Sequence, residues 1–549
     1  MNKKAVISVI LGCVLLLSAC KTAPVVKNSS TLANSSQTVT RELVANTYTA
    51  GYPIVKDKVE LSVMVMKGAD TGDFNTMKFT SDYEAKTNIK IKWIVADISR
   101  MDEATQIMYN TGNYPDIYAM WGSIKDTYLE RYGVKEKKIL ELTDEMLSKW
   151  APNISAKYVE QPISKESVIR SDGKMYSIPM INDAQQVTYL IRKSWLDNLD
   201  LEVPTTTDEF YNVLKKFKDG DPNGNGEKDE IPFAFSYYDP GVLFNPWGLA
   251  ITWGKYITID TKGKFHFAMT TNAFKEGLTY WKKLYDENLF DKGAADGTTK
   301  LLELVKTGKV GVTYWISVVH LEDARLAADF IPMGTPKATT AVEDFQAGIN
   351  HFSFGVLPLS GYFLSAKNEN VEASLRWIDF FYSNEGEMYK DYGGEPGKYY
   401  DVIDNKYIIN YKALPGGKAP NQDTPGYCLH GSYQFKEGEL LRPDSTNQSE
   451  IEKAGYKFED ALKPILISGT PTVLMPFLAF TLDEADAVYS GSQAVNNAIN
   501  WGTATIRGET LETGAVNPLT NWSGFVNEWN RRGALKLVEI YQKKYDATK

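Results

Sequence analysis

Short apolar stretches alternate with helix-like stretches through the first part of this 549-residue sequence. In the first of them Leu61, Val63 and Val65 occupy every second position, which is the period of a strand. The pattern predicts strands at 59–66, 89–95 and 115–120, and helices at 79–86 and 101–109. Strands that alternate with helices form βαβ units and a mostly parallel sheet. The expected fold class is therefore α/β.

Ligands of such sheets bind beyond the carboxyl ends of the strands. Trp121 directly follows the third strand, which puts it close to the expected mouth of a binding site. Asp116 stands at the start of the same strand, which is early for a ligand-binding position.

The length and composition indicate a globular protein with more than one core. A chain of 549 residues suggests two or three domains, and 43% of its residues are hydrophobic. Its formal net charge of −9 argues against nucleic acid as a partner, because phosphate binding needs a basic face. No internal repeat at a fixed period is found. The segment 391–447 is rich in Gly, Pro, Tyr and Asn and predicts a long loop region.

The N-terminus predicts export. Lys3 and Lys4 precede the apolar run 5–17, which is too short to span a bilayer comfortably and is typical of a signal peptide. The run ends in Leu-Ser-Ala-Cys, which resembles the bacterial lipobox, in which Cys20 is acylated and becomes the mature N-terminus. We expect a signal peptide at 1–19, a lipidated Cys20 with a flexible tether at 20–52, and anchoring at the extracellular face of the cell membrane. The alternatives are an uncleaved anchor and a cleaved signal with a chance cysteine.

Cysteine content excludes a disulfide framework under this reading. Cys13 leaves with the signal peptide and Cys20 carries lipid, so that Cys428 alone remains. The fold must then rest on the size of its cores.

A loop of alternating oxygen-bearing residues at 219–232 predicts a calcium site. Calcium takes about 6–8 oxygen ligands from carboxylates, amides and carbonyls. With Asp221 at position 1 of an EF-hand loop, the residues at positions 3, 5, 7 and 9 are Asn223, Asn225, Glu227 and Asp229. The acid expected near position 12 arrives early, as Glu230, so the match is partial. The alternative is a solvated acidic turn, since Asp, Asn and Gly are ordinary turn residues.

Several blocks together resemble the extracellular solute-binding lipoproteins of carbohydrate ABC transporters. They are the segment 304–315, which ends in Trp315, the segment 366–386, and the acidic loop with the Glu-Ile-Pro that follows it. The first resembles the part of maltose-binding-type proteins that leads to a ligand-stacking aromatic residue. The loop is similar to the calcium loop of alginate-oligosaccharide-binding proteins.

The resemblance implies a type II periplasmic-binding-protein fold, in which two α/β lobes are joined by a hinge that the chain crosses more than once. We expect one lobe from 53–186 with 355–395, and the other from 187–350 with 400–549. The resemblance also implies a structural Ca²⁺ held by the oxygens of Asp221, Asn223, Asn225, Glu227, Asp229 and Glu230.

Aromatic residues are the main candidates for contacts with a sugar, because sugar rings present apolar faces that stack on them. Trp315 is the first candidate; the others stand beside glycine or in loop-like contexts, and they are Trp121, Trp253, Trp247 and Trp501. Asp116 and Glu395 are polar candidates for the sugar hydroxyls. The alternative for each tryptophan is a core position, and for each acid a turn or a helix cap. Trp281 and Trp377 lie on apolar helical stripes and are assigned to the core.

The expected function is capture of an oligosaccharide between two lobes and its delivery to the permease subunits of an ABC importer, by a monomer without catalytic activity. One rival is an exported glycoside hydrolase or lyase. His266, His320, His351 and His430 are scattered, and neither a zinc H-E-x-x-H pair nor a G-x-S-x-G elbow occurs. A second rival is a sensory lipoprotein that binds glycans with the same fold.

Overall fold

The computed structural model describes residues 41–549 apart from short internal gaps. The gaps are 69–70, 123, 183–187, 236–239, 250, 252–255, 293–297, 316–317, 322, 341–344, 346–355, 405, 411–412, 414–421, 434–447, 469–475 and 496–497. The signal peptide and Cys20 therefore lie outside the described residues.

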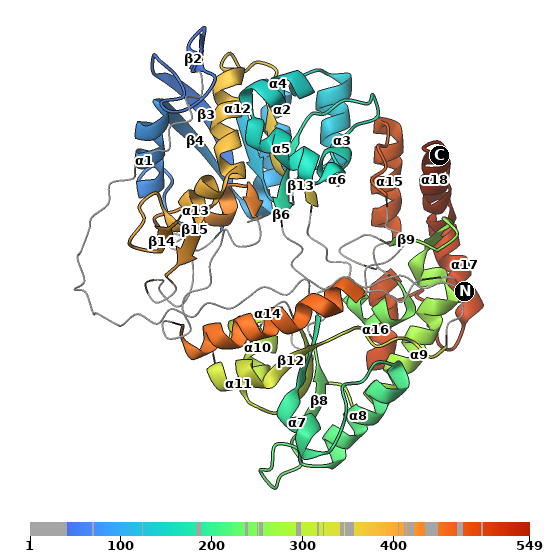
Figure 1. The fold of residues 1–549 in the computed structure, drawn as a ribbon. Coiled ribbons are helices and arrows are strands. Elements are labelled where there is room, and N and C mark those ends of the chain that lie inside the picture. Colours follow the sequence, from blue (N-terminus) through green and yellow to red (C-terminus); the bar gives the residue numbers. More distant parts are fainter. Residues whose placement is uncertain are drawn as a thin grey trace, which may run out of the picture.

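The first lobe is built on a six-stranded sheet with the order β16-β6-β13-β5-β3-β4. Its strands are β3 (Val59–Lys67), β4 (Ile89–Asp97), β5 (Ile117–Met120), β6 (Ile178–Asn182), β13 (Val356–Leu364) and β16 (Ser432–Tyr433). β3 is parallel to both β4 and β5, whereas β13 is antiparallel to its neighbours β5 and β6. Figure 1 shows this lobe in the upper half of the molecule, with helices around the sheet.

The helices of the first lobe cover both faces of its sheet. They are α1 (Lys78–Thr87), α2 (Met101–Thr111), α3 (Asp126–Tyr128), the π-helix η2 (Leu129–Lys135), α4 (Asp144–Trp150), α5 (Pro152–Glu160), α6 (Pro162–Glu166), α12 (Val371–Asp379) and α13 (Asn384–Tyr392). Side chains alternate along β3, so that Val63 and Val65 enter one hydrophobic core while Met64 and Met66 enter another. A strand with two buried faces explains why this sheet needs helices on both sides.

The second lobe contains a four-stranded sheet with the order β12-β7-β11-β8. Its strands are β7 (Thr188–Arg192), β8 (Ile231–Ala234), β11 (Val310–Trp315) and β12 (Phe330–Met333), and a separate hairpin pairs β9 (Ile257–Ile259) with β10 (Phe265–Phe267). The helices between them are α7 (Lys193–Asn198), α8 (Thr207–Asp219), α9 (Asn272–Asp286), α10 (Thr298–Lys306) and α11 (Ala324–Asp329). A capping box at Thr206 and Glu209 begins α8.

Both tryptophans assigned to the core are buried. Trp281 is on α9, and its indole nitrogen donates a hydrogen bond to the carbonyl of Leu243 over 2.6 Å. Trp377 is on α12 and packs edge-on against Phe381 in the first lobe. These two interpretations of the sequence are confirmed.

The C-terminal part of the chain returns to both lobes. The hairpin β14–β15 (Tyr400–Ile403 and Lys406–Ile409) is followed by β16, which pairs in parallel with the edge strand β6. α14 (Glu450–Ser468) then packs on α11 and β12 of the second lobe. The segment that reaches residue 433 thus completes the first sheet, although we expected the second lobe to begin at residue 400. The free edge of β6 offers backbone donors and acceptors that a distant strand can satisfy.

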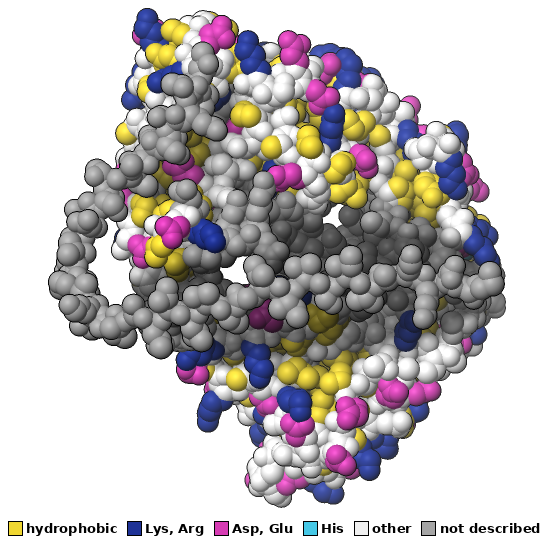
Figure 2. All heavy atoms as spheres, in the orientation of Figure 1, with side chains coloured by type: hydrophobic (Ala, Val, Ile, Leu, Met, Phe, Trp, Pro, Cys, Tyr) yellow, Lys and Arg dark blue, Asp and Glu magenta, His cyan; other side chains and the backbone are white. Residues whose placement is uncertain are grey.

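Four further helices end the chain: α15 (Leu482–Val495), α16 (Ala498–Arg507), α17 (Trp522–Arg532) and α18 (Ala534–Asp546). α16 packs on α9, and α18 packs on α15 and β10. α15 also touches α3 and η2, so that it bridges from the second lobe to the first, as the right side of Figure 1 shows. Positive and negative side chains are interspersed over both lobes on the face seen in Figure 2.

The folded body begins before the expected end of the tether. β1 (Leu43–Val44) and β2 (Thr47–Tyr48) form a small hairpin. The Arg376 guanidinium of α12 donates hydrogen bonds to the carbonyls of Tyr48 and Gly51, the latter over 3.0 Å. These bonds hold the hairpin on the first lobe. Among the helices described, none combines the length and the apolar character needed to cross a membrane.

Candidate functional site

The chain passes from the first sheet to the second between Asn182, which ends β6, and Thr188, which begins β7. A link of this length spans about 20 Å at most, so these two strand ends are close. β5 runs in the same direction as β6 and ends at Met120, while β11 is antiparallel to β7 and its Trp315 pairs with Thr188. We call the sheet edges that carry Asn182, Met120, Thr188 and Trp315 the facing edges.

Trp121 lies at the facing edge of the first lobe, directly after β5. The turn that follows it is fixed by Gly122, which has a φ of 60° and donates its backbone N–H to Oγ of Ser360 over 2.7 Å. Ser360 is buried in β13, so the central strand of the sheet holds this turn in place. Trp121 itself is half-buried, and it keeps part of its indole available for contact.

His430 lies behind Trp121 and was not predicted as a site residue. Its ring centroid is 5.8 Å from that of Trp121. Its backbone N–H donates to Oη of Tyr362 over 2.9 Å, and the Tyr362 hydroxyl donates to the His430 carbonyl over 2.6 Å. The side chain is fully buried, and neither ring nitrogen makes a hydrogen bond of good geometry in the described part of the chain; the backbone of Met120 acts on the ring and raises its pKa. No sequence motif marks this histidine, because its neighbours come from strands far away in the sequence.

Burial and the nearby Lys390 ammonium lower the pKa of His430 to about 3, so its imidazole is neutral at physiological pH. Lys390 is buried on α13 and pairs with Asp391 over 2.7 Å and with Glu387 over 3.5 Å. Burial raises the pKa of the Glu387 carboxyl well above its usual range.

Trp315 stands at the facing edge of the second lobe by its backbone register with Thr188. Its neighbour Tyr314 is buried in the second-lobe core. Trp253 lies outside the described residues.

Trp247 and Trp501 are packed inside the second lobe. Trp247 ends the 3-10 helix η3 (Pro240–Trp247), is 7% exposed and packs edge-on against Tyr280. Trp501 on α16 is 3% exposed and donates its indole N–H to Glu512 over 2.7 Å. The structure therefore does not bring these two tryptophans together with Trp121 at a common surface.

The two polar candidates are engaged elsewhere. Asp116 precedes β5, at the end of the sheet opposite the facing edge, and its Oδ2 accepts hydrogen bonds from the Ser62 backbone and hydroxyl over 2.8 and 2.7 Å. This carboxylate ties β3 to β5. Glu395 is 70% exposed and pairs with Lys78 over 3.0 Å, beside a cavity of about 40 Å³ next to α1.

The acidic loop connects α8 with β8 in the second lobe and folds around the side chain of Asp221. The two carboxylate oxygens of Asp221 accept the backbone N–H groups of Asn225 and Gly226 over 3.1 and 3.0 Å. Gly224 and Gly226 both have positive φ, 71° and 78°, which turns the backbone toward Asp221. The amides of Asn223 and Asn225 donate to Oδ1 of Asp229 over 3.3 and 3.1 Å.

Glu230 lies at the end of this loop, next to the acids Asp221 and Asp229. Both of its carboxylate oxygens are buried, and neither has a hydrogen-bond partner within the residues described. Burial raises the pKa of Glu230, and repulsion by Asp221 and Asp229 raises it further. The Asp229 carboxylate pairs with Lys309 over 2.8 Å, which lowers the pKa of Asp229. No group of three or more His, Cys, Asp or Glu side chains is gathered for a metal in the described residues, so amide and carbonyl oxygens would have to complete the set.

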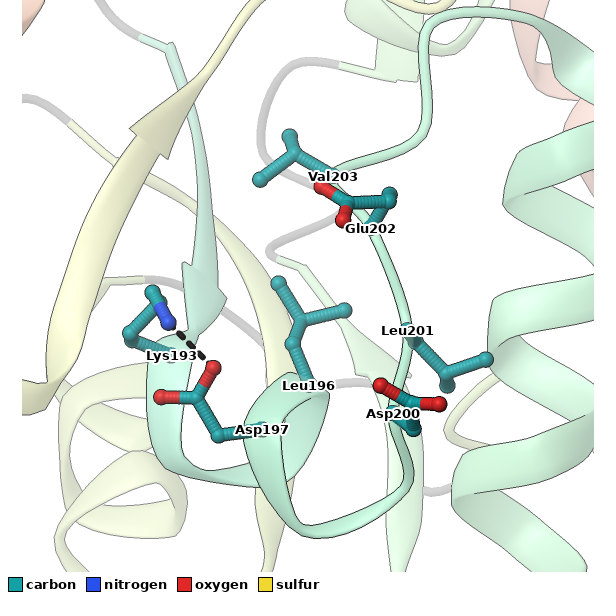
Figure 3. A pocket seen from close by; sticks show the side chains of 7 residues that line it. All are labelled: Lys193, Leu196, Asp197, Asp200, Leu201, Glu202 and Val203. Atoms are coloured by element: carbon teal, nitrogen blue, oxygen red, sulfur yellow. Dashed lines mark hydrogen bonds and ion pairs between the residues drawn. The ribbon is translucent and has the colours of Figure 1, made fainter.

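A cavity of about 170 Å³ in the second lobe lies away from the facing edges. Figure 3 shows its lining: the Lys193–Asp197 ion pair on one side, Asp200 and Glu202 on the other, and leucine and valine side chains between them. The cavity adjoins α7, which follows the far end of β7 from Thr188. Its position separates it from Trp121 and Trp315.

Comparison with known proteins decides the family. A sequence profile described as bacterial extracellular solute-binding protein matches residues 69–388, which is more than half of the chain. The chain belongs to this family. Lipoprotein LipO of Bacillus subtilis is 30% identical to this solute-binding protein over 90% of the chain and 93% of LipO. The fructooligosaccharide ABC transporter substrate-binding protein FusA of Streptococcus pneumoniae is 26% identical, over 62% of the chain and 64% of FusA's own length.

Solved structures share the fold of this solute-binding protein. An extracellular solute-binding protein from Bifidobacterium longum subsp. infantis has a TM-score of 0.73 at 22% identity, over 89% of this chain and 98% of that one. A FusA EF-hand mutant of S. pneumoniae in complex with fructo-nystose has a TM-score of 0.67 at 20% identity, over 89% of this chain and 99% of that one. The alginate-binding protein AlgQ2 without calcium ion has a TM-score of 0.65 at 21% identity, over 90% of this chain and 100% of that one.

These matches confirm the predicted family and the two-lobed α/β fold. They also confirm that the chain is a binding protein and not an enzyme, because the matching family is described as solute-binding and the similar protein FusA as a substrate-binding protein. The family is extracellular, in agreement with the export signal in the sequence. The individual ligand contacts of this chain remain predictions.

Proposed function

We propose that this solute-binding protein captures an oligosaccharide between its two lobes and delivers it to the permease subunits of an ABC importer. The observation that carries the proposal is the position of Trp121 and Trp315, each at a strand end on the facing edges. The printed descriptions of FusA as a fructooligosaccharide transporter protein and of AlgQ2 as alginate-binding support a saccharide ligand.

The chemistry of a sugar suits this arrangement. Aromatic side chains cover the apolar C–H faces of the ring and each bury about 150–250 Å². Hydroxyls need hydrogen-bond partners, because a buried polar group without one costs about 1–3 kcal/mol. Trp121 would stack on the ligand from the first lobe and Trp315 from the second, with Trp253 as a further contact. The remaining candidates would stabilise the fold and would not contact the ligand; they are Trp247, Trp501, Asp116 and Glu395.

The chain connectivity supports a hinge. The main chain passes between the lobes at 182–188, 333–356 and 433–450. Chain connections of this kind between two lobes permit hinge closure of one lobe against the other. We propose that the first lobe consists of 43–182 with 356–433, and the second of 188–333 with 450–546. A ligand that contacts both lobes shifts the equilibrium toward the closed form, which the permease would recognise.

Binding to a panel of oligosaccharides, measured by calorimetry, tests the proposal. We expect one saturable ligand that is recovered uncleaved, and a loss of affinity of at least about tenfold in both Trp121→Ala and Trp315→Ala. Trp522→Ala is the matched control, because Trp522 is also half-buried but lies on α17 beside Lys275. Turnover of the ligand, or a peptide as the sole binder, would overturn the proposed function.

We also propose that the acidic loop holds a structural calcium ion. Its ligands would be the side-chain oxygens of Asp221, Asn223, Asn225, Asp229 and Glu230 and the carbonyl of Glu227. The Glu230 carboxylate supports a cation there, because its two oxygens are buried next to two other acids and make no hydrogen bond of good geometry in the described residues, and backbone groups offset this only in part. The ion would fasten the loop between α8 and β8 and would neutralise the three acids. The description of FusA as an EF-hand protein agrees with this proposal.

We propose that lipid on Cys20 anchors the protein to the outer face of the cell membrane as a monomer. The cysteine follows an apolar run that begins after two lysines, which is the order expected of a lipoprotein signal. Mass spectrometry of the mature protein should find an acylated N-terminal cysteine, and Cys20→Ser should move the protein from the membrane fraction to the medium. Equal membrane retention of that variant would contradict the anchor.

A further inference from the structure

His430 is a buried polar side chain, and no structural role of its imidazole is evident in the described part of the fold. Its backbone is already fixed by two hydrogen bonds with the Tyr362 hydroxyl. Its imidazole is fully buried, and neither ring nitrogen makes a hydrogen bond of good geometry among the residues described, although the backbone of Met120 at the end of β5 acts on the ring and raises its pKa. A neutral imidazole offers one N–H donor and one acceptor. Leaving such groups unmatched costs about 1–3 kcal/mol, and native structures hold few of them, often at functional sites.

The position of this imidazole points to ligand binding. It lies 5.8 Å from the half-buried ring of Trp121, with an angle of 41° between the two planes. Trp121 lies at the facing edge of the first lobe. Burial, and after it the Lys390 ammonium, lowers the pKa of the ring and keeps it uncharged, so that the imidazole can donate one hydrogen bond and accept another. A sugar hydroxyl is both a donor and an acceptor and therefore matches either nitrogen.

We propose that His430 is the hydrogen-bonding residue of the saccharide subsite in the first lobe, with Trp121 as its stacking surface. The inference rests on the proposed function and adds a specificity residue to it. Because His430 is buried, the proposal requires that a sugar ring that stacks on Trp121 displaces the indole far enough for a hydroxyl of the same ring to reach an imidazole nitrogen. In the free protein the ring nitrogens without good hydrogen bonds carry a free-energy cost. That cost falls only when the bound ligand has a hydroxyl at the matching position. An analogue that lacks this hydroxyl would leave the nitrogen buried and unmatched.

Substitution of His430 separates a binding role from a structural role. His430→Phe fills the same space without polar atoms, so the free protein should keep or gain thermal stability while its affinity for the oligosaccharide falls at least about tenfold. His430→Asn retains a donor and an acceptor and should keep affinity within about threefold. Wild-type affinity in His430→Phe would overturn the inference. So would a sharp fall in its melting temperature, because the nitrogens would then have a structural partner.

A measurement on the unmodified protein gives a second test. The chain has four histidines, so the ring nitrogens of ¹⁵N-histidine-labelled protein give few NMR signals, and His430→Asn assigns those of His430. Addition of the oligosaccharide should shift a ring nitrogen of His430, and Trp121→Ala should abolish that shift. Binding without any change at His430 would refute the subsite and leave the proposed function intact. Failure of every saccharide to bind wild-type protein would refute the proposed function itself.

Discussion

Glu230 combines three properties that rarely occur together in a carboxylate. Its oxygens are buried, they lack partners in the described region, and Asp221 and Asp229 lie close enough to raise its pKa. The proposed calcium ion would supply the partner that these oxygens lack. The consequence is measurable without any ligand of the binding site.

Calcium and pH should act on the same carboxylate. The pKa of Glu230 in the folded protein is raised above its ordinary 4.5, so folding favours the protonated form. Without calcium, its contribution to stability is complete below pH 4.5 and is lost as the pH rises through the folded-state pKa. A chelator at neutral pH should therefore lower the melting temperature by a few degrees, and Glu230→Gln should abolish both this response and its part of the pH dependence. Thermal unfolding with and without calcium, from pH 4 to 8, measures both.

Asp219→Asn is the control for this prediction. Asp219 ends α8 just before the loop, and it is not among the expected ligands. The variant should lower its melting temperature on chelation as the wild type does. An unchanged wild-type melting temperature on chelation would favour the alternative of a solvated acidic turn.

The position of a single residue in the fold could be predicted only where it follows from the neighbouring sequence. Trp121 follows a strand that its own residues specify, so its place at the strand end could be deduced. Asp116 is a carboxylate on the same strand, but its role depends on Ser62, which is distant in the sequence and adjacent in the sheet. His430 escaped notice for the same reason, since Tyr362 and Trp121 come from other strands.

The strand β13 shows how much one element can constrain a sheet. It lies between β5 and β6, and its register with β6 shifts between Leu357 and Gly361. Gly361 has a φ of 136°, and a Cβ there would lie 2.0 Å from the carbonyl oxygen of Ile178. Glycine is therefore required both by the backbone angle and by the close approach of β6.

Gly361→Ala should destabilise the protein by about 3 kcal/mol or more, because backbone strain and a steric clash add. Gly173→Ala is the matched variant: its φ is 79°, but nothing lies within 4 Å of an added Cβ. This variant should lower the free energy of unfolding by about 1–2 kcal/mol, because alanine is strained in the left-handed conformation. Urea unfolding measures both, and equal losses would show that the contact with Ile178 is unimportant.

Elements with a strong local period were predicted well, and those that depend on distant pairing were missed. The expected strand at 89–95 is β4, and the helix at 101–109 is α2. The predicted loop region 391–447 instead contains the hairpin β14–β15 and the two-residue strand β16. β16 is too short to leave a pattern of its own, because its stability comes from the edge of β6.

At the scale of the whole molecule, α15 connects the two lobes outside the three main-chain connections. Asp486 on α15 pairs with Arg131 of the π-helix η2 over 3.5 Å, and both side chains are about half exposed. Nearby, the Lys125 ammonium lies 5.4 Å from the ring of Tyr489. Exposed ion pairs contribute about 0.2–1 kcal/mol, which is enough to bias a balanced equilibrium between lobe arrangements.

Arg131→Asp should weaken this contact and increase the radius of gyration of the ligand-free protein, measured by small-angle scattering at low salt. Combination with Asp486→Arg should restore the wild-type value, because the pair is then attractive again. Both effects should diminish at high salt. Lys193→Asp makes the same change of charge at a pair within α7 and should leave the radius unchanged. An increase in both single variants would point to net charge as the cause.

The two-lobed fold could be deduced from the sequence because alternating strands and helices, the acidic loop and the segment before Trp315 occur in one order. The exact division of the chain could not. Ser432 and Tyr433 belong to the first sheet through backbone pairing with β6, and such bonds carry no residue-specific signal.

The late position of β13 in the chain affects how the protein can be made and exported. Its partners β5 and β6 are complete once residue 182 has been synthesised, but the strand between them ends at Leu364. Until then β5 and β6 have no common neighbour, and the first lobe cannot close its sheet. The first sheet can therefore be completed only after all four strands of the second sheet, the last of which ends at Met333, have been synthesised.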